Sequence, residues 1–229
     1  MDLERVKLTS RHMLMSGLSV VVMWAGLATP ARGGPANPAD VLVAGRPPTI
    51  DTTAEWDRKW GLGQFGRIGF ATIGQELTGP DEPSALTRFV FYLGSSTESG
   101  LVDLRGELYR WNGDRAIGRS IWESDTRTVE LRQDQPSFQP LSFAVDGARL
   151  KSGQRYVLFI SISKDYASCD PDVGGLVGLS TGDDPYGGGT TVALDNKSRP
   201  KSWKQQAWRS FAYDLAFKAW FRPDTSSSL

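Results

Sequence analysis

The chain has 229 residues, a length that fits one sizeable domain plus a targeting segment. Its 26 basic and 26 acidic residues cancel, so the net charge gives no indication of a nucleic-acid partner or an anionic membrane surface. The single cysteine, Cys169, excludes an intramolecular disulfide, and 25 Gly and 13 Pro indicate a globular chain with many turns.

Residues 1–31 are expected to form a secretory signal peptide. Basic residues near the N-terminus precede an apolar run over residues 13–28, and small residues follow it. The alternative is a retained anchor, although this run is shorter than the about 20 residues that a membrane span needs. Cleavage would remove His12, the only histidine, and would leave a secreted or periplasmic product without a membrane anchor.

Three further regions are expected after the signal peptide. Residues 32–48 are rich in Gly, Pro and Ala, which is typical of a flexible leader. Residues 49–223 carry the apolar pattern of a folded domain, and residues 224–229 form a polar tail.

Within the domain, apolar residues recur at every second position instead of every 3.6, which predicts strands. In residues 101–111, Val102, Leu104 and Leu108 would face a core while Tyr109 and Trp111 point outward. This pattern predicts an all-β fold, a two-sheet antiparallel β-sandwich of jelly-roll type with eight or nine strands. The strands are expected, in chain order, over residues 65–77, 86–93, 101–111, 120–123, 128–131, 139–145, 155–163, 190–194 and 210–221.

Turns are expected where Asn, Asp and Gly cluster, because these residues tolerate positive φ. Residues 112–114, 146–147, 152–153 and 174–175 have this composition. Residues 196–209 fit no strand and are expected to form a long loop with a short helical turn.

Histidine-dependent catalysis is excluded for the processed chain, since nucleophile–imidazole mechanisms and zinc or non-haem iron sites need imidazoles or clustered cysteines. No glycine-rich phosphate loop is present either. Glycoside hydrolysis needs only two carboxylates roughly 5 to 10 Å apart. Asp103 and Glu107 on one strand would be about 13 Å apart, which is too far, so only carboxylates from different strands could serve.

Calcium is the one metal whose ligands the sequence offers, because it binds oxygen atoms in irregular loops. The candidate ligands are Asp170, Asp172, Asp183 and Asp184, in two loops that flank a short strand. The alternative is that these residues only build turns beside Pro and Gly. No other cofactor is expected.

Aromatic residues offer a binding surface. Exposed rings stack on the apolar faces of sugars, and neighbouring polar groups bind the hydroxyls. The alternative is that the rings lie under a loop or close the sandwich edge. The candidate ligand-binding residues are Tyr109, Trp111, Asn112, Asp114 and Trp122.

Several segments resemble exported bacterial β-sandwich proteins of the kind that often carry a PEP-CTERM sorting signal. The central segment has Trp111, Gly113 and Gly118 followed by the Ile-Trp-Glu-Ser run of residues 121–124. This resemblance implies the fold and export but no active site, and the expected sorting tail is missing. The other matching segments are FATIGQ at 70–75, FVFYLG at 89–94, LKSGQRYVLFIS at 150–161 and YDLAFKAWF at 213–221.

The expected function is that of an exported, non-catalytic module that binds an extracellular polysaccharide or another extracellular polymer. Two alternatives remain open: a glycoside-active enzyme with a pair of carboxylates, and a structural envelope component whose sheet edges pair with neighbours. The oligomeric state is left open.

Overall fold

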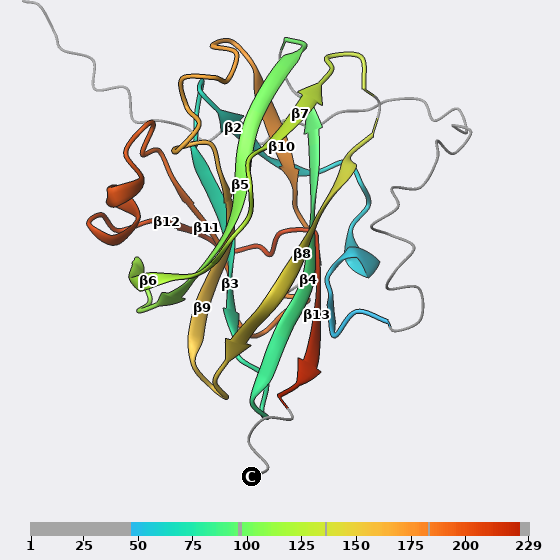
Figure 1. The fold of residues 1–229 in the computed structure, drawn as a ribbon. Coiled ribbons are helices and arrows are strands. Elements are labelled where there is room, and N and C mark those ends of the chain that lie inside the picture. The colour runs from blue at the N-terminus through green and yellow to red at the C-terminus, as the bar shows by residue number, and fades with distance from the viewer. Residues whose placement is uncertain (1–46, 96–97, 136, 183, 225–229) are drawn as a thin grey trace, which may run out of the picture.

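Two antiparallel sheets face each other and contain all the strands of the described chain (Figure 1). The computed structural model describes residues 47–95, 98–135, 137–182 and 184–224. The predicted all-β sandwich is therefore confirmed. No helix in this part of the chain has the length and apolar character that a membrane span requires. The predicted signal peptide, most of the leader and the tail after residue 224 lie outside the described residues.

The first sheet has a central strand, β4, with neighbours along both of its edges. β13 and β10 pair with one edge, and β8 pairs with the other. The sheet order is β1 (Ile50–Asp51), β13 (Phe217–Pro223), β4 (Ser84–Ser95), β10 (Gly174–Gly178) and β2 (Gly61–Gly66), with β8 (Gln139–Leu150) on β4.

The second sheet is built in the same way around β5, which pairs with β9 on one side and with β6 and β7 on the other. Its order is β12 (Arg209–Phe211), β11 (Thr191–Leu194), β3 (Thr72–Thr78), β9 (Arg155–Ser161), β5 (Gly100–Trp111) and β6 (Ala116–Glu123), with β7 (Arg127–Leu131) on β5. Two 3₁₀ turns complete the elements, η1 (Thr53–Glu55) and η2 (Pro200–Lys204).

The described chain has 13 strands, more than the eight or nine expected, because two predicted strands are divided and two strands, β1 and β10, were not predicted. Residues 65–77 contain the end of β2 and most of β3, separated by a turn at Gly66, whose φ of 140° favours glycine. Residues 210–221 contain parts of β12 and β13. The expected turn at residues 174–175 is instead the buried start of β10.

The main core lies between the sheets and has a group of aromatic rings at its centre. Phe89 of β4 stacks on Phe143 of β8 at a centroid distance of 4.7 Å, and the two residues are register partners. β5 passes close to this stack at Gly106, where a Cβ atom would lie only 2.9 Å from Cζ of Phe89. The alternation predicted for β5 is confirmed, since Val102, Leu104 and Leu108 are fully buried in this core.

One side of the sandwich is closed where β7 of one sheet meets β8 of the other. The guanidinium of Arg127 donates a hydrogen bond to the carbonyl oxygen of Ser142 and lies 5.1 Å from the ring centroid of Phe143. The side-chain amide of Gln139 donates to the carbonyl oxygen of Glu130 at 3.1 Å. These side chains occupy backbone acceptors on both facing edges.

A second apolar cluster lies on the outer face of the second sheet, away from the main core. The segment of residues 196–209, which includes η2, covers this face and inserts two tryptophan rings. Its short helical turn was expected, and it ends before Trp208. We call this group the outer cluster: Tyr109, Trp111, Ala116, Val157, Phe159, Val192, Leu194, Trp203 and Trp208.

Candidate functional site

A pocket of about 200 Å³ opens between two connections at one end of the second sheet. One connection precedes β11, and the other is the stretch of residues 212–214 between β12 and β13. The lining residues come from these two connections: Asp184, Gly189, Thr190, Ala212, Tyr213 and Asp214.

Asp214 supplies a buried carboxylate to this pocket and is only 1% exposed. Its Oδ1 accepts a hydrogen bond from Nε2 of Gln75 at 2.6 Å, and its Oδ2 accepts one from the backbone N–H of Tyr186 at 3.0 Å. Gln75 is itself fixed, because its Oε1 accepts from the backbone N–H of Leu215 at 2.9 Å. The carboxylate is thus held in one orientation.

The pKa of Asp214 is raised to about 6. Burial is the main cause, because it removes water from the charged form, and the negative charge of Asp184 raises the pKa further. The hydrogen bonds from Tyr186 and Gln75 act in the opposite direction. Near neutral pH this carboxylate is mostly charged, and it can accept hydrogen bonds from a ligand.

Tyr213 places an aromatic ring at the same pocket. It is 54% exposed, more than any other aromatic side chain among the described residues. Its carbonyl oxygen accepts a hydrogen bond from the backbone N–H of Thr191 at 2.9 Å, which fixes the chain at the start of β11. An exposed ring beside carboxylates can stack on the apolar face of a sugar while the sugar's hydroxyls are bound.

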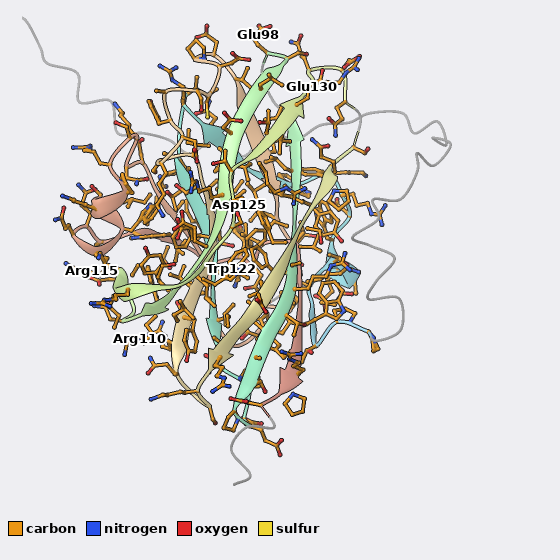
Figure 2. All side chains as sticks on the ribbon, in the orientation of Figure 1. Glu98, Arg110, Arg115, Trp122, Asp125 and Glu130 are labelled. Atoms are coloured by element: carbon orange, nitrogen blue, oxygen red, sulfur yellow. The ribbon has the colours of Figure 1, made fainter. Side chains whose placement is uncertain are left out.

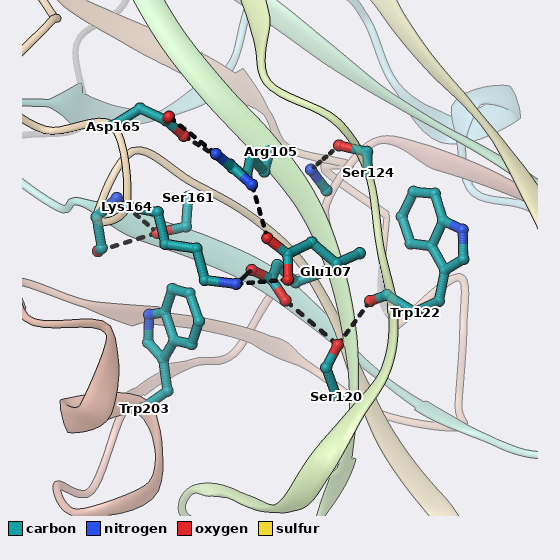
Figure 3. Close-up of polar contacts among 12 residues, drawn as sticks. Arg105, Glu107, Ser120, Trp122, Ser124, Ser161, Lys164, Asp165 and Trp203 are labelled. Carbon is teal, nitrogen blue, oxygen red and sulfur yellow. Dashed lines mark hydrogen bonds and ion pairs between the residues drawn. The ribbon is translucent and has the colours of Figure 1, made fainter.

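A second group of charged side chains lies on the outer face of β5, near the outer cluster (Figure 3). Nζ of Lys164 is 2.7 Å from Oε1 of Glu107 and 2.6 Å from Oε2 of Glu123. Arg105 connects Glu123 to Asp165, with its nitrogens 2.9 and 2.8 Å from the two carboxylates. Within the described residues, Oε1 of Glu107 has no partner placed to form a hydrogen bond, so its interaction with Lys164 is an ion pair only.

Glu107 is fully buried, and burial raises its pKa to about 7, although the ion pair with Lys164 lowers it. Lys164 also lies 5.3 Å from the ring centroid of Trp203, which covers the group from outside. The carboxylates are thus already paired with protein cations. We interpret this group as structural.

The expectation that Tyr109 and Trp111 present exposed rings is wrong. Their exposed fractions are 7% and 2%, because Trp203 and Trp208 lie over them. Both rings do point away from the main core, as the alternation predicts, but residues 196–209 take the place of solvent. The rings of Tyr109 and Trp111 therefore lie under a loop, which is the alternative given in the sequence analysis.

The other three aromatic-surface candidates have structural partners. Trp122 packs edge-on against Phe89 at a centroid distance of 5.7 Å, so it belongs to the rim of the main core. Asn112 is exposed, and its Oδ1 accepts hydrogen bonds from the backbone N–H groups of Asp114 and Arg115 in the β5–β6 turn. Asp114 forms an ion pair with Arg115 at 2.7 Å.

The proposed calcium ligands are not brought together. Asp170 and Asp172 precede β10 and Asp184 follows it, so the two loops lie at opposite ends of a five-residue strand, roughly 16 Å long. Oδ2 of Asp170 instead accepts the backbone N–H of Leu101 at 2.7 Å. Asp183 lies outside the described residues, and within the described ones no group of three metal-ligating side chains is found.

Sequence reasoning missed Tyr213 and Asp214 because residues 210–221 look like one alternating strand. A signal was present: Asp214 is a lone charge in the apolar run of residues 211–217, where a continuous buried strand would not place it. Cys169 is buried, and burial raises the pKa of its thiol to about 11.

Comparison with known proteins gives no relative for this chain. No family model matches it, and neither a curated protein nor a solved structure does. The fold is therefore established by the structure itself, and the function has to be argued from the pocket.

Proposed function

We propose that this chain is an exported, non-catalytic β-sandwich module that binds carbohydrate at the pocket of Tyr213 and Asp214. The observation that carries the proposal is the pairing of an exposed aromatic ring with a buried, oriented carboxylate in one pocket. The ring offers an apolar face to the C–H groups of a sugar. The carboxylates of Asp214 and Asp184 offer charged acceptors for its hydroxyls, and charge-assisted hydrogen bonds are the strong ones.

The pocket also limits the ligand. Its volume of about 200 Å³ is below the roughly 300 to 1,000 Å³ of sites for drug-sized ligands. It suits one sugar unit, such as a chain end or a single residue of a polymer. Export is supported by the order of basic, apolar and small residues at the N-terminus.

A glycan array followed by calorimetry tests this function. We expect wild type to bind one class of neutral saccharide, and Tyr213→Ala to weaken that binding by about fivefold or more, because one stacked ring contributes on the order of 1 kcal/mol or more. The control is Leu101→Ala, which removes another exposed hydrophobic side chain, 47% exposed and on β5. Failure to bind any glycan, or equal binding by Tyr213→Ala and wild type, would refute carbohydrate binding at this pocket.

A carboxylate-pair glycoside hydrolase is a second candidate, favoured by one observation. Asp214, whose pKa is about 6, shares the pocket with Asp184, and a carboxyl group with a raised pKa can act as a general acid. This function predicts release of reducing ends from the bound saccharide and its loss in Asp214→Asn. Binding without turnover over many hours would leave the binding module as the function.

A further inference from the structure

A group of exposed basic side chains lies beside the outer cluster, and we call it the cationic surface. Its members come from the segment that covers the outer cluster, next to the β5–β6 hairpin. None of them has an ion pair within the described part of the chain, and none lies over an aromatic ring there. They are Lys197, Arg199, Lys201 and Lys204.

Packing contacts hold these two segments together. The backbone N–H of Trp208 donates to the carbonyl oxygen of Asp114 at 2.7 Å, directly at the hairpin turn. The rings of Trp208 and Trp111 meet at a centroid distance of 5.4 Å, and η2 contacts β6. Figure 1 shows η2 on the same side of the molecule as the β6 hairpin, and Figure 2 shows Arg110 and Arg115 at that hairpin.

The charge of this surface is unbalanced although the whole chain is neutral. Residues 195–209 contain five basic residues and one acidic residue, Asp195. Elsewhere cations such as Arg105, Arg115 and Arg149 face carboxylates within 3.4 Å. Like charges within about 10 Å repel each other in dilute salt, so an anionic partner would relieve this repulsion.

The side chains around the cations favour an acidic polysaccharide over a nucleic acid. Single-stranded nucleic acid is usually bound by stacking of bases on exposed rings. Here Trp203 and Trp208 are 2% and 6% exposed, so neither offers a ring face. The exposed amides of Gln205 and Gln206 offer donors and acceptors for hydroxyls.

We propose that the cationic surface binds a polysaccharide whose sugar units carry carboxylate groups. The proposal concerns a surface separate from the pocket of Tyr213, and it does not depend on sugar binding there. The acidic groups would lie along the cations of this segment, while the amides contact hydroxyls.

Binding to immobilised polygalacturonate tests the proposal, with neutral dextran as the uncharged polymer. We expect the full chain to bind polygalacturonate at low salt, to release it at high salt, and to ignore dextran. The triple variant K197E/K201E/K204E should lose about tenfold or more in affinity, since reversed charges repel the polymer. The matched control is K59E/K151E/R222E, which makes the same charge change at exposed basic residues elsewhere and should keep its affinity.

Three outcomes would overturn the proposal: no binding to polygalacturonate, equal losses in both triple variants, or equally tight binding of single-stranded DNA. Circular dichroism and thermal unfolding confirm that each variant is folded. Tyr213→Ala separates the two proposals, because it should weaken neutral-sugar binding while leaving polygalacturonate binding unchanged. The triple variant should do the reverse.

Discussion

The two faces of β5 are buried by different means. Leu104 and Leu108 enter the main core, where the opposing surface is another sheet with the same alternating pattern. On the other face, Tyr109 and Trp111 are covered by a segment that contains only a 3₁₀ turn. The first kind of burial repeats along many strands, whereas the second depends on a few anchoring rings.

The two faces also differ in polarity. The main core is formed by apolar side chains, but the outer face of β5 carries the network of Glu107, Lys164 and Glu123. Trp111 adds a buried indole N–H that has no hydrogen-bond partner among the residues that the structure describes. Such groups cost free energy when buried, so the outer cluster should contribute less net stability than the main core.

The largest effect is expected in the main core. Phe89→Ala removes a fully buried ring that contacts Phe91, Phe143 and Trp122, and should lower the free energy of unfolding by about 3 to 5 kcal/mol. Urea unfolding measures this loss. Leu101→Ala, at an exposed site, should change the value by less than about 0.5 kcal/mol. Comparable losses in the two variants would contradict this account of the core.

A smaller and more local effect is expected for Trp208→Ala. The ring contacts Trp111 and Phe159, but it anchors a surface segment that can rearrange, so we expect about 3 kcal/mol or less. In hydrogen-exchange measurements, relative to wild type, the variant should exchange its backbone N–H at position 208, which bonds to Asp114, much faster, while the amides of β4 change little. Uniform acceleration over both sheets would mean that the outer cluster and the main core unfold as one unit.

The smallest effect is a dependence on pH. The pKa of Glu107 is raised to about 7 in the folded protein from 4.5, so the folded state holds a proton that the unfolded chain has released in this interval. The contribution of Glu107 to the free energy of unfolding should therefore be most favourable below about pH 4.5 and should fall as the pH rises toward 7. The change is on the order of 1 to 3 kcal/mol.

Glu107→Gln isolates this contribution, because a neutral amide does not titrate. Its free energy of unfolding should depend less on pH between about 4.5 and 7 than that of wild type. Asp214 contributes in the same direction up to about pH 6 in both proteins and therefore cancels in the comparison. Glu130→Gln, at an exposed position of β7, serves as the control. Identical pH profiles for wild type and Glu107→Gln would rule out this role of Glu107.

The sheets could be predicted because a period of two is a local property of the sequence. Alternation correctly placed Leu104 and Leu108 inside and Tyr109 and Trp111 on the opposite face. It could not show whether solvent or another segment covers that face, since the contact between Trp111 and Trp208 spans almost a hundred residues. The pocket was hidden for the same reason: Asp184 and Asp214 meet only through the folding of two separate connections.

The closed side between β7 and β8 bears on how the chain behaves when concentrated. A strand without a neighbour can template the addition of a strand from another molecule, and this is one route to fibrils. At this side the carbonyl oxygens of Ser142 and Glu130 are already engaged by Arg127 and Gln139, and a positive charge stands where a second backbone would have to approach. Growth of polymers by strand addition is therefore obstructed along β8, which weakens the idea that this edge links the molecule into an envelope lattice.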